Sequence, residues 1–198
     1  MGSLYDQRTF SMRLLFAAAL LICLPATAFA QDKPTFAGPY AGPEAGVLIH
    51  GFRLGDDVSS RKYVGAGLAG GGFAGIMLPA SESLRLGGEV AVQAGGGTVR
   101  SQQIFAFYEQ KARWGYSVTA RAGYVVGDRT MVFAEAGYGG YCYDVRLANV
   151  IDDDGNGPSG LVGGIGIERQ IGRNIGIRLR AQAGQEHGRI LIGLPIRF

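Results

Sequence analysis

Trp114 to Val126 reads WGYSVTARAGYVV, an unbroken alternation of two kinds of residue. Every second position, beginning with Trp114, is apolar or aromatic, and the positions between are mostly small or polar. Successive side chains of a β-strand point to opposite faces, so a period of two predicts a strand. One face of this strand is greasy with aromatic residues towards both ends, and the other carries Arg121.

Seven further stretches show the same kind of pattern and complete a set of eight expected strands. They lie near 38–49, 62–78, 84–94, 131–145, 161–171, 175–186 and 190–198. Each has about ten residues or more, the length that crosses a membrane on a tilt. The stretch 62–78 is so rich in Gly and Ala that its facing is not predicted.

The expected connections alternate in length. Short turns lie at 79–83, 127–129 and 172–174, whereas longer links lie near 50–61, 98–109 and 146–160, and the last hairpin, near 186–189, is short. Short turns on one side and long loops on the other are typical of bacterial outer-membrane barrels. We therefore predict an all-β fold, an eight-stranded antiparallel up-and-down transmembrane β-barrel with both termini in the periplasm.

The first thirty residues predict an export signal. Arg13 precedes the apolar run 14–25, and Ala28-Phe29-Ala30 supplies small residues before a cleavage site. This arrangement is a cleaved signal peptide over 1–30, with translation beginning at Met1 or Met12, and leaves a barrel domain over 31–198. The remaining chain then has one cysteine, Cys142, and no internal disulfide is expected.

Composition excludes several other classes of protein. The chain has 198 residues, enough for one domain, and its 34 glycines follow no collagen period. A hydrophobic content of 47% is too high for a disordered chain. The net charge of +3 comes without a basic block, so we expect no nucleic-acid partner.

The enclosed face of the expected barrel carries acids and arginines. They are Glu44, Arg85, Glu89, Arg121, Glu135, Glu168, Arg178, Arg180 and Arg197. An eight-stranded barrel has an interior just wide enough for side chains to fill it, and buried charges persist only when they are paired. We therefore predict a stacked Glu–Arg network that plugs the lumen, with glycines making room for the long side chains.

Several strands resemble a known family in the order in which they occur. GPYAG at 38–42 with EAG at 44–46, YSVTARAGY at 116–124, AEAGYG at 134–139 and IGLPIRF at 192–198 are similar to the small outer-membrane β-barrels. That family includes OmpA-like, opacity-type and porin-like surface antigens of Gram-negative bacteria. The resemblance covers roughly 36–198. It implies an outer-membrane location and an assembly signal at Phe198, and it leaves the activity open, because members are described as structural proteins, adhesins, antigens or weak porins.

Two motifs that elsewhere bind ligands have weak support here. Gly65 to Gly70 satisfies G-x-G-x-x-G, but more glycines and Pro79 follow where a dinucleotide site needs a helix. Asp152 to Gly157 opens like a calcium loop, but Gly163 stands where the bidentate acid belongs, which favours an acidic outward loop. We predict no cofactor and no metal.

Histidines and rim cations offer two further hypotheses. His50 with Ser59 and Asp56 nearby allows a lipid A-modifying hydrolase, although a histidine at a strand end is more often a rim residue. Cations near the two first long links are placed to meet lipopolysaccharide phosphates, or are ordinary solvated charges. These cations are Arg53, Arg61, Lys62, Arg100, Lys111 and Arg113.

The leading hypothesis is a non-enzymatic outer-membrane protein with a structural or surface-exposed role. Its expected partners are outer-membrane lipid and lipopolysaccharide, and the barrel-assembly machinery during insertion, with the chain acting as a monomer. A small porin-like channel or a solute-binding barrel is the alternative, and a lipid A-modifying enzyme is a third class.

Overall fold

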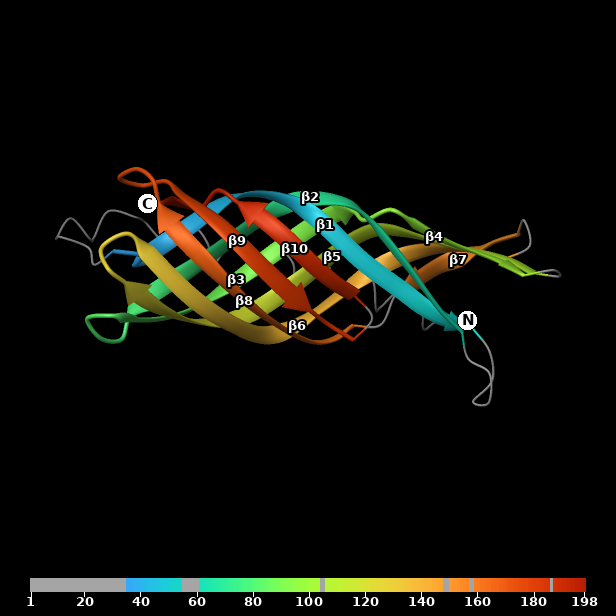
Figure 1. The fold of residues 1–198 in the computed structure, drawn as a ribbon, viewed down its shortest axis with the longest axis horizontal. Coiled ribbons are helices and arrows are strands. Elements are labelled where there is room, and N and C mark those ends of the chain that lie inside the picture. The colour runs from blue at the N-terminus through green and yellow to red at the C-terminus, as the bar shows by residue number, and fades with distance from the viewer. Residues whose placement is uncertain (1–34, 55–60, 104–105, 148–149, 157–158, 186) are drawn as a thin grey trace, which may run out of the picture. The chain divides into compact units, whose positions relative to one another are not determined.

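The computed structural model of the chain describes residues 35–54, 61–103, 106–147, 150–156, 159–185 and 187–198 (Figure 1). The expected signal peptide, 1–30, lies outside these residues. Every regular element among them is a β-strand. No helix in this part of the chain is long and apolar enough to span a membrane.

Eight of the strands form the barrel wall in the described part of the chain. They are β1 (Gly38–Leu54), β2 (Arg61–Pro79), β3 (Leu84–Gly95), β5 (Ala106–Val126), β6 (Thr130–Leu147), β8 (Gly160–Gln170), β9 (Gly176–Ala183) and β10 (His187–Gly193). Three shorter strands are attached to this wall. They are β4 (Thr98–Gln103), β7 (Val150–Asn156) and β11 (Ile196–Arg197).

The wall closes on itself through antiparallel pairs. Neighbouring strands follow one another around the wall, and β1 pairs with β2 on one side and with β10 on the other. In Figure 1 the wall strands run at a common slant along the barrel. Closure gives each wall strand a partner on both sides, which a sheet in hydrocarbon requires. The predicted eight-stranded antiparallel barrel is confirmed.

Side chains alternate around the wall as the sequence pattern predicts. The outward face is apolar, with Val118, Ile165 and Leu179 all exposed, whereas the charged and small residues point inward. Aromatic residues lie on the outward face towards both ends, with Trp114 near one end and Tyr124 near the other. The structure also settles the facing of 62–78, where Leu68 and Ile76 point outward.

Two of the predicted loops are largely strands. The links expected at 98–109 and 146–160 contain β4, which pairs with the start of β5, and β7, which pairs with the end of β6. Three consecutive glycines with positive φ, Gly95 to Gly97, lie between the end of β3 and the start of β4. Glycine adopts such φ values without steric cost, so the chain bends there and then resumes pairing. We call the barrel end that bears β4 and β7 the ribbon end, and the end with the short turns 80–83, 127–129 and 171–175 the turn end.

A charge placed on the outward face tests whether that face lies in lipid. Ile165 is 67% exposed on β8 and Ile171, just past its end, is 61% exposed. We expect Ile165→Arg to lower the free energy of unfolding by about 2–4 kcal/mol in vesicles, because an arginine near the bilayer midplane is costly, and Ile171→Arg by only about 0–1 kcal/mol near the interface. Urea titration of the vesicle-inserted protein measures both. Equal, negligible effects would contradict a lipid-facing wall.

Candidate functional site in the barrel lumen

Three carboxylates meet inside the barrel although they come from different strands of its wall. Glu44 on β1, Glu89 on β3 and Glu135 on β6 are each at most 5% exposed. Alternation directs all three inward, since their strand neighbours point to lipid. One arginine, Arg180, contacts all three carboxylates, so the three acids belong to a single cluster.

Two arginines of β9 reach these carboxylates across the lumen. Arg178 contacts Glu89 (Nη1 to Oε2, 2.6 Å) and Glu44 (Nη2 to Oε2, 3.2 Å). Arg180 contacts Glu44 (Nη2 to Oε1, 2.5 Å), Glu89 (Nη1 to Oε1, 2.8 Å) and Glu135 (Nη1 to Oε1, 3.4 Å). A planar guanidinium with several donors can bridge carboxylates in this way. The ion pairs therefore tie β9 to strands that are not its neighbours.

Arg121 and Tyr40 complete the cluster from β5 and β1. Arg121 pairs with Glu135 (Nη2 to Oε2, 2.5 Å) and Glu89 (Nη1 to Oε2, 2.9 Å). The Tyr40 hydroxyl donates to Glu89 at 2.9 Å and accepts from Arg121 at 3.2 Å. Gly75 lies opposite Tyr40, where an added Cβ would come within 2.6 Å of the tyrosine oxygen. Glycine makes room here for a long side chain.

Aromatic rings lie against two of the guanidinium groups. The Arg178 guanidinium carbon lies 3.7 Å from the centre of the Phe73 ring, and that of Arg121 lies 4.2 Å from the centre of the Phe133 ring. A cation over an aromatic face is attracted by the ring quadrupole, most strongly when both are desolvated. The rings thus offset part of the cost of burying these charges.

Amides and a fourth arginine join the cluster, and the sequence interpretation left them out of it. Gln93 donates to Glu44 at 2.5 Å, and Gln182 donates to Glu135 at 3.0 Å. Arg189 on β10 donates to the side-chain oxygens of Gln93 and Gln182. Extending the inward face of β10 two residues towards its start, from Leu191, would have identified Arg189. We call these ten residues the lumen cluster: Tyr40, Glu44, Glu89, Gln93, Arg121, Glu135, Arg178, Arg180, Gln182 and Arg189.

Three of the predicted network residues, Arg85, Glu168 and Arg197, lie outside the lumen cluster. The Arg85 side chain donates to four backbone carbonyls at the turn end, those of Thr35, Ser81, Glu82 and Leu84. Arg85 is the second residue of β3, beside the turn 80–83, so the carbonyls of that turn are within reach of its guanidinium. Glu168 and Arg197 form a separate buried pair (Nη2 to Oε1, 2.5 Å).

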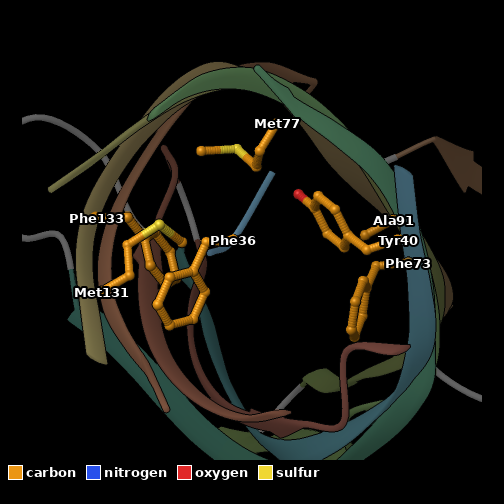
Figure 2. Close-up of a cluster of buried hydrophobic side chains, with 7 residues drawn as sticks. All are labelled: Phe36, Tyr40, Phe73, Met77, Ala91, Met131 and Phe133. Carbon is orange, nitrogen blue, oxygen red and sulfur yellow. The ribbon is translucent and has the colours of Figure 1, made fainter. Parts of the chain in front are cut away.

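Apolar layers lie on both sides of the lumen cluster. Towards the turn end, Figure 2 shows a group of side chains directed into the barrel interior: Phe36, Tyr40, Phe73, Met77, Ala91, Met131 and Phe133. Towards the ribbon end lies a second group: Leu48, Ala69, Ala112, Tyr141 and Tyr143. The lumen cluster thus has an apolar group on each side, and Tyr40 belongs both to the cluster and to the turn-end group.

The glycine bend between β3 and β4 contributes backbone acceptors to the ribbon-end layer. The Tyr141 hydroxyl donates to the Gly95 carbonyl at 2.7 Å, and His50 Nε2 donates to the Gly96 carbonyl at 3.1 Å. An added Cβ at Gly96 would lie 2.3 Å from Leu48 Cδ2. The bend therefore packs into the lumen at this level.

A family model decides where this chain belongs. The model described as outer membrane protein beta-barrel domain matches residues 16–187, most of the chain. The chain belongs to the outer membrane protein β-barrel domain family. As a member of this family it is a protein of the bacterial outer membrane of Gram-negative organisms.

Solved structures of other outer-membrane barrels are similar to this family member. Ail of Yersinia pestis, crystallised with the heparin analogue sucrose octasulfate, is 13% identical over 81% of this chain and 99% of Ail, with a TM-score of 0.48. Neisserial surface protein A is 13% identical over 82% of this chain and 98% of that one, also with a TM-score of 0.48. The KdgM porin is 10% identical over 81% and 99%, with a TM-score of 0.30. A search of curated proteins finds no match.

The remaining candidate sites of this β-barrel family member differ in how far the structure describes them. The G-x-G-x-x-G stretch, 65–70, lies inside β2, so it forms a strand and opens no helix. His50 is buried in the lumen, and its proposed partners Asp56 and Ser59 lie outside the described residues. The side chains of Asp152 to Asp154 also lie outside them. No three His, Cys, Asp or Glu side chains among the described residues are grouped to hold a metal.

Removing one carboxylate charge tests how strongly the lumen cluster holds the barrel together. We expect Glu89→Gln to lower the free energy of unfolding by about 3–5 kcal/mol, because it leaves buried guanidinium groups short of a counter-charge. Glu109→Gln is the matched control, since its pair with the largely exposed Arg100 (2.9 Å) should be worth less than about 1 kcal/mol. Urea unfolding in vesicles compares the two variants. A similar decrease in the free energy of unfolding for both would contradict the proposed contribution of the lumen cluster to stability.

Proposed function

We propose that this outer-membrane barrel is a non-enzymatic protein with a closed lumen, acting as a structural or surface-exposed component of the cell envelope. The observation that carries the proposal is the cross-lumen contact of Arg178 and Arg180 with carboxylates on β1, β3 and β6. Side chains that meet across the lumen occupy the space through which ions would have to pass, which supports a closed lumen. The two apolar layers support the same conclusion above and below the lumen cluster.

Charge balance supports a plug better than a selective pore. The lumen cluster holds four arginines and three glutamates, a formal excess of one positive charge. Each glutamate pairs with at least two of Arg121, Arg178 and Arg180, while Arg189 binds the side-chain oxygens of Gln93 and Gln182. Ion channels expose rings of charge to the permeating ion, whereas here most of the charges are paired with one another. A lipid A-modifying activity gains no support from His50, which is buried among lumen side chains.

Planar bilayers test the closed lumen directly. The refolded wild-type protein should give no stable unitary conductance steps, because the charged and apolar layers block ion passage. A general porin inserted in the same bilayer is the positive control, and heat-dependent electrophoretic mobility confirms that the inserted protein is folded. Discrete, reproducible steps from the wild-type protein would establish the porin-like alternative.

Cations near the ribbon end support a contact with lipopolysaccharide. Arg100, Lys111, Arg113 and Arg146 are all exposed, close in sequence and strand register to the interfacial Trp114. Two acids, Glu109 and Asp144, lie among them. We propose that the ribbon end faces outward and that these cations meet the phosphates of the outer leaflet, where guanidinium forks and ammonium groups bind well.

A pair of matched variants tests this contact. Wild-type protein should resist urea better in lipopolysaccharide vesicles than in phosphatidylcholine vesicles, and Lys111→Ala with Arg146→Ala should abolish about half or more of that difference, since phosphate contacts are charge-dependent. Arg129→Ala with Arg173→Ala removes the same charge from turn-end positions and should leave the difference intact. Equal effects of the two double variants would refute a specific contact.

The last strand supports a proposal about assembly. Phe198 is exposed on the lipid side of the wall, and its backbone nitrogen donates to the Pro39 carbonyl at 3.1 Å. We propose that the barrel-assembly machinery recognises this terminal aromatic residue and that the inserted protein is a monomer.

A further inference from the structure

The segment that precedes β1 enters the barrel. Phe36 is 1% exposed and Ala37 is 8% exposed, and both lie ahead of the first wall strand. Figure 2 shows the Phe36 ring inside the barrel outline beside Met131 and Phe133. Because the Phe36 ring is buried among side chains of the barrel interior, the segment 35–37 is part of the lumen filling.

The backbone of this segment is strained in order to place the ring. Phe36 has a φ of +65°, and it is the one non-glycine residue with positive φ in the described part of the chain. A bulky residue in this region costs of order 1–3 kcal/mol and persists only where the surroundings over-determine it. The contacts of the segment must therefore outweigh that cost.

Two arginines hold the segment at the turn end. Arg85 Nε donates to the Thr35 carbonyl at 2.9 Å, and the same guanidinium binds the carbonyls of Ser81 and Glu82 in the β2–β3 turn. The Arg197 guanidinium carbon lies 5.0 Å from the centre of the Phe36 ring, while its pair with Glu168 fixes it in place. These are the predicted network arginines that do not belong to the lumen cluster, and the segment accounts for their positions.

We propose that residues 35–37 form a stopper that closes the turn end of the barrel and can be withdrawn without opening the barrel wall. Its occupant is this chain's own segment, Phe36 is the sealing group, and Arg85 and Arg197 are the latch. The inference rests on the proposed closed lumen and deepens it. Because the stopper lies in series with the lumen cluster, its withdrawal admits water and small reagents to the turn-end layer but not ions across the barrel.

Native methionines report whether the stopper seals. Met77 and Met131 are 0% exposed and lie in the layer that Phe36 joins. In Phe36→Gly, which also relieves the strained φ, oxidation of both by chloramine-T should quicken by about ten-fold or more, since thioether oxidation follows access. Phe36→Leu retains an apolar group and should remain close to wild type. Peptide mass spectrometry of the folded, detergent-solubilised protein measures each rate.

A reporter at the other end separates a lost stopper from a loosened barrel. Leu48→Met, a swap of similar volume, places a thioether in the ribbon-end layer, where it should stay protected with either residue at position 36. Equal oxidation of Met77 and Met131 in wild type and Phe36→Gly would overturn the proposal, as would a parallel rise at position 48. Should Phe36→Gly fail to fold, Arg85→Lys, which loses the guanidinium fork, should show the same selective rise, and its absence would also overturn the proposal. Conductance by the wild-type protein would refute the closed lumen and not the stopper, because the stopper is tested by the oxidation rates. Phe36→Gly is expected to oxidise faster and still not conduct.

Discussion

Backbone hydrogen bonding in a medium without water is the constraint on which this structure depends. Each peptide group left unpaired in hydrocarbon costs several kcal/mol, so a sheet in the membrane must have no edge. The pairing of β1 with β10 removes the edge here, from Glu44 opposite Gly193 to His50 opposite His187. Once closure is imposed, the inward residues of all eight strands face a common space that is just wide enough for side chains to fill. The chemistry of the lumen follows from that geometry.

The lumen charges solve a problem that closure creates. A buried ion pair seldom gains net stability over an apolar pair of equal volume, because desolvation cancels most of the attraction. Here each carboxylate has several donors, and Phe73 and Phe133 lie against the guanidinium groups. The arrangement specifies one register, because a slip of one residue would turn Glu89 towards lipid.

Two-residue alternation was enough to predict the fold class, the strand count and most facings, because one face of each strand must be greasy and the other must suit a filled lumen. It was insufficient for 62–78, where glycine and alanine occur on both faces and only the burial of Phe73 and Met77 reveals the inward side. It was misleading for 98–109 and 146–160, since a polar hairpin beyond the membrane resembles a loop in composition. Inward position alone could not distinguish Arg85 from Arg121. Which acid an arginine meets depends on height along the axis, and that follows from strand tilt and register.

The order of the lumen charges along the chain has a consequence for how the barrel is completed. The three glutamates of the lumen cluster occur at 44, 89 and 135, whereas three of its four arginines occur at 178, 180 and 189. A nascent or truncated polypeptide ending before β9 thus carries the three glutamates of the lumen cluster and only one of its four arginines, Arg121. Closing such a fragment into a barrel would bury carboxylates without enough arginines to pair with them. The hairpin of β9 and β10 therefore supplies three of the four arginines of the lumen cluster, so the cluster is complete only when both strands are in place.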